Sequence, residues 1–163
     1  MNWDFGGETE VVNAVWLGTA SGDFANPNNW STLKVPDDHT RVFVFAREGE
    51  SKSVTASTAI SMRDLVLESR PFGKVTFKAS KSMSVVENFD VGTNTTVYLD
   101  DPAGNRVGGN VVMRSGALMT HTELSSSATT LADASYKLNL SVDGDMTLAK
   151  GAVINVSAKG YPL

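Results

Sequence analysis

Apolar and polar residues alternate in short runs along most of this chain, with the period of two that predicts β-strands. The two clearest runs, Asp64–Glu68 and Lys74–Lys78, are joined by the turn residues Pro71-Phe72-Gly73. Abundant serine, threonine and valine and scarce helix signals also indicate a β protein. Three further strands, the first of them an edge or capping strand, are predicted at Val11–Val15, Arg41–Phe45 and Ser53–Ala56.

The strand pattern also repeats. The segment that starts at Val107, VGGNVVMRSGALMTH, aligns with the segment that starts at Val142, VDGDMTLAKGAVINV. A third copy, VVENFDVGTNTTVYL, starts at Val85. Repeats at about 22–24 residues are typical of solenoids, in which each strand pairs with its counterpart one coil further on. That spacing recurs between the apolar residues Val44, Leu67, Val91 and Met113.

We therefore predict an all-β fold, a parallel β-solenoid of about four to five coils. Residues 1–40 are expected to form an N-terminal capping segment with aromatic residues, and residues 41–163 the solenoid domain. An antiparallel β-sandwich is the alternative, because it also has many short strands. The sandwich, however, has no reason to repeat in register at the spacing of one coil.

The alternation fixes which side chains face inward, since neighbouring residues of a strand point to opposite faces. At the turn of each coil, Asn88, Asn110 and Asp145 should stack as a structural column that exchanges hydrogen bonds between coils. We prefer this structural role to a binding role for the three residues. The inward set, coil by coil, is Phe89, Val91, Val97 and Leu99, then Val111, Met113, Met119 and His121, then Met146, Leu148, Ile154 and Val156.

The last repeat differs from the others. A longer step precedes it, and the polar stretch Ser125–Thr130 within that step is expected to form a protruding loop. No capping segment is evident after Val142–Ala158, so the end of the core should remain open. We expect a partner chain or further repeats to cover this end, at an interface that includes Met146, Leu148, Ile154, Val156 and Tyr161.

Residues 16–46 are the most distinctive stretch of the sequence. Trp16, Phe24 and Trp30 are separated by Gly, Asn, Pro and Asp, which build turns rather than regular elements. A long irregular segment stays ordered in a compact domain only if something holds it, and large aromatic side chains can do so by burial. We expect this segment to close the open end of the core.

The same stretch resembles the segment that precedes the repeats in secreted bacterial β-helix surface proteins, including autotransporter-like proteins. Their pattern, W-x-G…G-x-W…N-W…P…D-x-V-x-F, is matched within residues 16–45, although Phe24 stands where tryptophan is usual. The resemblance implies a right-handed β-helix or similar solenoid on a surface, and it implies no enzyme activity. The match is carried by Trp16, Gly18, Gly22, Asn29-Trp30, Pro36 and Val42–Phe45.

Composition narrows the classes of function. The 163 residues suffice for one domain with a core, and the formal net charge of −4 comes without a basic block, so nucleic acid is not expected as a partner. No apolar run is long enough to span a membrane, and the first residues lack the features of an export signal. The absence of cysteine excludes disulfides and thiolate chemistry.

Candidate chemistry is sparse. The acidic pairs Glu87/Asp90, Asp100/Asp101 and Asp143/Asp145 form no column of carboxylates in the predicted register, so we expect no catalytic site. His39 could join Asp37 and Asp38 at a metal ion, but a turn before a strand is the preferred interpretation. We expect no cofactor. Calcium is the one ion considered, at Asp100–Asn105, and Tyr98 is the one outward aromatic that would suit a sugar.

These features favour a non-enzymatic structural or attachment module that self-associates or docks to a larger assembly. Two settings fit: an extracellular or cell-surface bacterial protein, favoured by the resemblance, and a virion protein such as a phage component, favoured by the lack of an export signal. The alternative function is a carbohydrate-binding or carbohydrate-cleaving β-helix domain, which needs acidic and aromatic side chains along one sheet.

Overall fold

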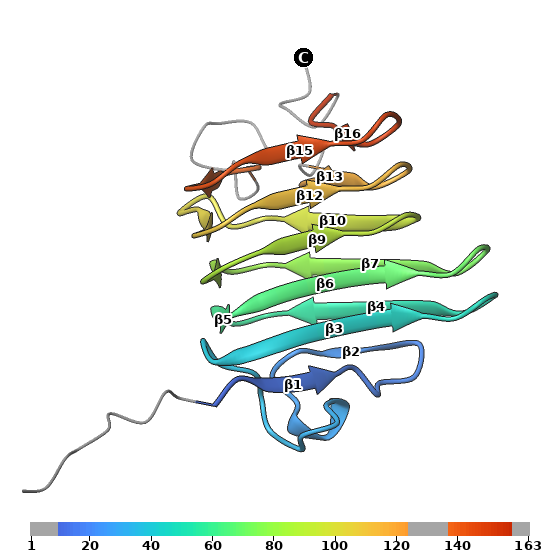
Figure 1. Cartoon of the computed structure of the whole chain (residues 1–163), viewed down its shortest axis with the longest axis vertical. Helices are drawn as coiled ribbons and strands as arrows, with labels where there is room; N and C mark the ends of the chain where they lie inside the picture. Colours follow the sequence, from blue (N-terminus) through green and yellow to red (C-terminus); the bar gives the residue numbers. More distant parts are fainter. Residues whose placement is uncertain (1–9, 124–136, 158–163) are drawn as a thin grey trace, which may run out of the picture.

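The computed structural model describes residues 10–123 and 137–157, which fold as a parallel β-solenoid with three sheets (Figure 1). The first sheet contains, in order, β1 (Val12–Val15), β3 (Thr40–Ala46), β6 (Asp64–Ser69), β9 (Phe89–Val91), β12 (Val111–Met113) and β15 (Met146–Leu148). The second contains β2 (Ser21–Asp23), β4 (Ser51–Ala56), β7 (Lys74–Ala79), β10 (Thr95–Leu99), β13 (Leu118–Thr120) and β16 (Val153–Ile154). The third contains β5 (Ile60–Met62), β8 (Met83–Val85), β11 (Asn105–Val107) and β14 (Leu140–Val142).

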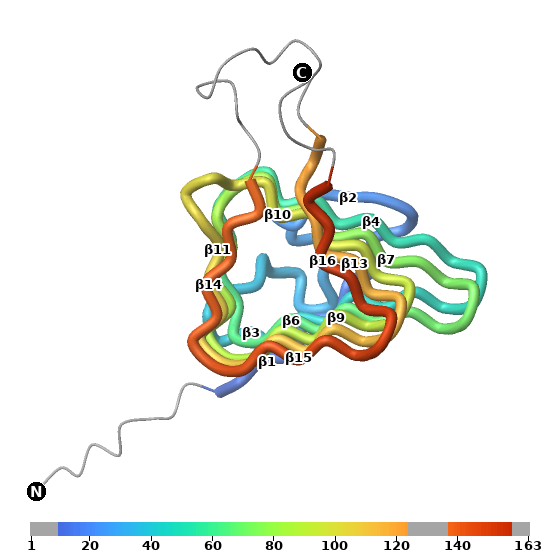
Figure 2. Tube along the Cα trace, turned by 90° about the horizontal axis from the view of Figure 1, so that it is seen from above, coloured from blue at the N-terminus to red at the C-terminus, as the bar shows by residue number. Residues whose placement is uncertain are grey.

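The solenoid prediction is confirmed, and the sandwich alternative is wrong. Successive strands of each sheet pair in parallel, one coil apart, and the chain visits the three sheets in turn (Figure 2). Leu65 pairs with Phe89, Phe89 with Val111, and Val111 with Met146. Each pair spans one coil, and the last one also spans the longer step, so the register is the one that the repeat predicts. The loop expected at Ser125–Thr130 lies outside the described residues.

The core is a stack of inward side chains inside the three sheets. Phe77, Phe89, Leu99, Met113 and Met119 are almost completely buried, because each is covered by its counterparts in the coils on either side. Their polar neighbours along each strand point outward, which is the alternation expected of a sheet with one buried face. No helix in the described part of the chain is long and apolar enough to cross a membrane.

The aromatic residues close the N-terminal end of this core. Trp30 packs edge-on against Trp16 and Phe24, with ring centroids 5.0 and 4.9 Å apart. All three side chains are buried, and a short 3₁₀ turn, η1 (Pro27–Asn29), lies between Phe24 and Trp30. β1 and β2 extend the first two sheets before residue 40, so the segment continues the sheets as well as covering their end.

The turn residues stack as a hydrogen-bonded column. The Oδ1 atom of Asp64 accepts the backbone N–H of Asn88, that of Asn88 accepts the N–H of Asn110, and that of Asn110 accepts the N–H of Asp145. The sequence interpretation had omitted Asp64, which lies one coil before Asn88. Each side-chain oxygen therefore holds the start of the next coil in register.

One corner of the solenoid is wider in the early coils than in the later ones. The turns between β3 and β4 and between β6 and β7, residues 47–50 and 70–73, project beyond the turns after β9, β12 and β15 (Figures 1 and 2). We call these two projecting turns the extended corner. The coils that follow are narrower here, so the extended corner overhangs them and leaves a recess on each side.

Candidate functional site

The last coil, formed by β14, β15 and β16, leaves apolar core side chains uncovered among the described residues. The inward side chains of earlier coils are almost completely buried, whereas four inward side chains of this coil, those of Met146, Leu148, Ile154 and Val156, are 36% to 51% exposed. The inward residues of β14, Leu140 and Val142, are partly buried against the core. β15 and β16 pair with β12 and β13 on the inner side, and no strand within residues 10–123 and 137–157 pairs with them on the outer side. The exposed set comprises Met146, Leu148, Val153, Ile154 and Val156. Tyr161, which the sequence assigned to the same surface, lies outside the described residues.

Polar groups of the last coil are also left open. β14, β15 and β16 are the terminal strands of the three sheets, so the outer edge of each has no strand partner in the part of the chain that the structure describes. Asp145 ends the turn column, and its carboxylate accepts no hydrogen bond from a described residue, unlike the side-chain oxygens of Asn88 and Asn110. The coil thus presents apolar side chains, strand edges and one acceptor in a single plane.

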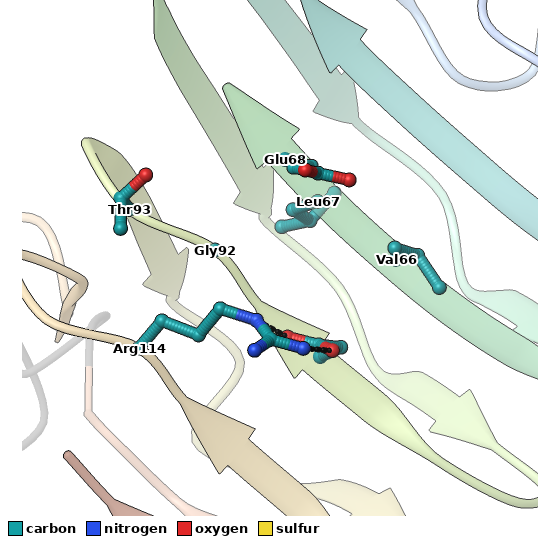
Figure 3. A pocket seen from close by; sticks show the side chains of 7 residues that line it. Val66, Leu67, Glu68, Gly92, Thr93 and Arg114 are labelled. Atoms are coloured by element: carbon teal, nitrogen blue, oxygen red, sulfur yellow. Dashed lines mark hydrogen bonds and ion pairs between the residues drawn. The ribbon is translucent and has the colours of Figure 1, made fainter. Parts of the chain in front are cut away.

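A recess of about 360 Å³ lies beside the extended corner on the first sheet (Figure 3). Arg114 reaches across it and binds Asp90 with two contacts, Nε to Oδ1 at 3.1 Å and an NH2 nitrogen to Oδ2 at 2.6 Å. These hydrogen bonds raise the pKa of Arg114 above its ordinary value, with a further contribution from the charge of Asp90. The Asp90 carboxylate is therefore held as an ion pair, which does not suit a general acid or base.

Three of the remaining acidic candidates also have charged partners. Glu87 pairs with Arg63 at 2.6 Å, and Asp143 pairs with Arg106. Asp100, the first residue of the segment considered for calcium, is fully buried, where it binds Thr122 and Lys78 rather than facing solvent with Asp101. Glu87, Asp90, Asp100 and Asp143 thus face arginine, lysine or threonine. Asp101 accepts a hydrogen bond only from the backbone of its own turn, and the carboxylate of Asp145 has no partner among the described residues.

The exposed turn before β3 holds the cluster of Asp37, Asp38 and His39, whose ligand atoms lie within 4.8 Å of one another. The Oδ1 atom of Asp37 accepts hydrogen bonds from Thr40 Oγ1 at 2.8 Å and from the His39 backbone N–H at 3.1 Å. His39 Nδ1 contacts Asp38 Oδ1 at 2.8 Å. The contacts are those of a hydrogen-bonded turn, in which Asp37 organises the entry to the strand.

The hydrogen bond from Thr40, followed by that from the His39 N–H, lowers the pKa of Asp37 below its ordinary value of 3.8. Since the folded carboxylate has the lower pKa, its contribution to stability is present above pH 3.8 and is lost as the pH falls through the folded pKa. Thr40→Val should move the pKa of Asp37 upward, measured by NMR titration, and reduce this acid-dependent loss. An unchanged pKa in Thr40→Val would contradict the role given to Thr40.

His121 and Tyr98 have structural surroundings. His121 faces inward and is 7% exposed, and its Nδ1 lies 2.7 Å from the Thr122 carbonyl oxygen, to which it donates. The sequence left open whether the coil opens there or the ring is buried and hydrogen-bonded, and the second interpretation is confirmed. Tyr98 lies on the outer side of β10, half-buried among neighbouring side chains.

Comparison of the chain with protein-family models, curated proteins and solved structures gives no match. The site residues therefore rest on geometry alone. Two of them were missed by sequence reasoning: Arg114, which reaches Asp90 diagonally rather than from the directly paired position, and Val153, which alternation places on the outer face. The alignment of Asp90 with Val112 gave no signal for the Arg114 contact.

Proposed function

We propose that this chain is a non-enzymatic structural or attachment module of a cell or virion surface, and that it enters its assembly by docking through the last coil. The observation that carries the proposal is the exposure of inward core residues there, led by Leu148 and Ile154. Solenoid ends with open strand edges require a cap or a partner, because unpaired edges otherwise template uncontrolled association.

The partner that fits this surface is a second copy of the chain, placed end to end. The opposite end is closed by Trp16, Phe24 and Trp30, so head-to-tail stacking would bring the open strand edges against a covered surface. A two-fold axis through the first sheet instead pairs β15 with its own copy in the antiparallel direction. The same apolar residues then cover one another, and the contact closes as a dimer rather than growing into a fibre.

Charge supports this antiparallel arrangement. β15 is preceded by Asp145 and followed by Lys150. Antiparallel pairing brings the acidic end of one strand beside the basic end of the other, and opposite charges across an interface favour one orientation. The outer lone pairs of Asp145, which no described residue uses, would face the partner in this contact.

The experiment measures mass by light scattering across a concentration series. Wild type should approach dimer mass, whereas Leu148→Asp and Ile154→Asp should remain monomeric with unchanged circular dichroism. Leu17→Asp is the matched control, because Leu17 is 58% exposed near the closed end and should keep the dimer. Lys150→Glu should weaken association a few-fold, and the double variant Asp145→Lys/Lys150→Glu should restore it.

Three results would refute the docking proposal. A wild-type chain that stays monomeric at millimolar concentration has no affinity at the last coil, and a species that grows beyond the dimer is not closed by a two-fold axis. Loss of the dimer in Leu17→Asp would place the contact at the other end of the solenoid.

A further inference from the structure

Phe72, at the tip of the extended corner, has an unusual combination of backbone and side-chain properties. Its φ angle is +61°, in the left-handed region, and its side chain is 83% exposed. Bulky residues rarely adopt such a φ angle, because the Cβ atom crowds the backbone. A strained residue is usually compensated by packing, but a ring this exposed gains little from the core.

The other turns of this corner show what folding alone requires. Gly49, Asn94, Gly116 and Gly151 all adopt positive φ angles of 51° to 88° at the corresponding turns of the other coils. Glycine and asparagine are the residues that tolerate this conformation best. The fold is therefore satisfied by small residues, and the aromatic ring of Phe72 contributes nothing that the turn needs. Backbone strain that no packing within the fold compensates is a reason to look for a function.

The ring borders an open recess of about 330 Å³ on the second sheet, between the extended corner and the narrower coils that follow it. This Phe72 recess lies on the opposite side of the corner from the recess of Arg114 in Figure 3. Its volume is at the small end of the range for ligand sites. The residues that line it include Phe72, Lys74, Asn94, Thr96, Gly116 and Leu118.

The polar side chains of the recess are available. Among residues 10–123 and 137–157, no hydrogen bond or ion pair engages the ammonium of Lys74, the amide of Asn94 or the hydroxyl of Thr96. They offer donors from all three groups and acceptors from the amide and the hydroxyl. Gly116 adds a stretch of backbone without a side chain, which a ligand can approach closely.

An exposed aromatic face beside free hydroxyl, amide and ammonium groups matches the chemistry of a sugar ring. One face of a pyranose carries C–H groups that stack on an aromatic ring, while its hydroxyls need donors and acceptors at the edge. We propose that the Phe72 recess binds a sugar unit of a glycan, with Phe72 as the stacking platform and Lys74, Asn94 and Thr96 as hydrogen-bonding residues. Lys74 would also favour a sugar that carries a carboxylate.

A protein partner suits the recess less well. Protein hot spots gather several apolar anchors in one patch, whereas the recess combines a single ring with three hydrogen-bonding side chains. The recess is lined by three successive turns of this corner, which contain Phe72, Asn94 and Gly116, and by the strand residues that follow them. No residue of the last coil lines it. Sugar binding therefore does not depend on the docking proposed for the last coil.

The test is a glycan array with the wild-type chain, followed by titration of the strongest ligand into matched variants. Phe72→Gly should lower the affinity about tenfold or more. The same substitution should raise the melting temperature by about 1–3 °C, because it relieves the positive φ angle. Phe72→Trp should retain binding, and Asn94→Ala should weaken it. Including both neutral and uronic acid glycans on the array tests the contribution of Lys74.

Leu33 provides a close control. It is also apolar, 68% exposed and at positive φ, +54°, but it does not line the recess. Leu33→Gly should raise the melting temperature in the same way and leave the glycan affinity unchanged. A silent array, or a ligand whose affinity survives Phe72→Gly, would overturn the proposal. So would an array ligand whose binding is lost in Leu148→Asp but kept in Phe72→Gly, since that result would place the sugar at the last coil.

Discussion

Replacing Trp30 by alanine is expected to lower the free energy of unfolding by about 3–5 kcal/mol, the range for a large buried aromatic. The side chain has no exposed surface, and its Nε1–H donates to the Phe24 carbonyl oxygen at 2.8 Å. The substitution removes this hydrogen bond and the edge-on contacts with Trp16 and Phe24. It also leaves a cavity at the closed end of the core, which the short loops there cannot fill.

Chemical denaturation followed by circular dichroism measures this loss. Leu17→Ala is the control, because Leu17 lies next to the same cluster but is largely exposed, and its loss should change stability by no more than about 0.5 kcal/mol. Trp30→Phe should fall between the two, since it keeps a ring but loses the indole donor. Equal stabilities for Trp30→Ala and Leu17→Ala would mean that the aromatic segment does not unfold together with the solenoid.

The repeat could be predicted because the stacking of coils requires the same type of residue at the same position of each coil. A side chain that packs on its counterpart one coil away must be apolar in every coil, which keeps Val91, Met113 and Leu148 in register. The aligned glycines have a similar cause. A Cβ atom on Gly144 would lie 2.5 Å from Asn110 Oδ1 and 2.7 Å from the Gly109 carbonyl oxygen, so the coils approach too closely for a side chain.

The extended corner could not be predicted from the same repeat. Leu67 and Val75 flank this corner in one coil, and Val91 and Thr95 flank it in the next, where the turn is shorter. A longer connection between β10 and β11 offsets the shortening, so the overall period hardly changes. Periodicity reports the length of a coil but not how its residues are divided among the corners. The recesses and the exposed position of Phe72 therefore required the structure.

Side-chain partners were also beyond the reach of the pattern. Alternation places Asp100 just after an inward leucine but does not distinguish a buried carboxylate from a calcium ligand in a loop. The distinction depends on Lys78 and Thr122, which lie one coil before and one coil after Asp100 and come from β7 and from the residues that follow β13. Long side chains can reach across a coil boundary, so register alone does not determine which groups meet.

The second large effect is expected at this buried carboxylate. Asp100→Ala should lower the free energy of unfolding by about 2–4 kcal/mol, because it leaves buried donors without an acceptor. Asp100 Oδ1 accepts the Thr122 backbone N–H at 2.7 Å, and Oδ2 accepts the Thr122 hydroxyl at 2.8 Å and lies 3.1 Å from the Lys78 ammonium. The Lys78 side chain is about one third exposed, so water can compensate that charge in part.

The adjacent Asp101 allows a matched comparison by thermal and chemical denaturation. Its Oδ1 accepts only the Ala103 N–H within the same turn, so Asp101→Ala should cost about 1 kcal/mol or less. Asp100→Asn retains one oxygen acceptor but removes the charge opposite Lys78, and its stability should lie between those of Asp100→Ala and wild type. If Asp100→Ala cost no more than Asp101→Ala, Thr122 would not depend on Asp100. The segment after β13 would then keep its position without the Asp100 carboxylate. We expect the opposite, because three short contacts join Asp100 to Thr122 and Lys78.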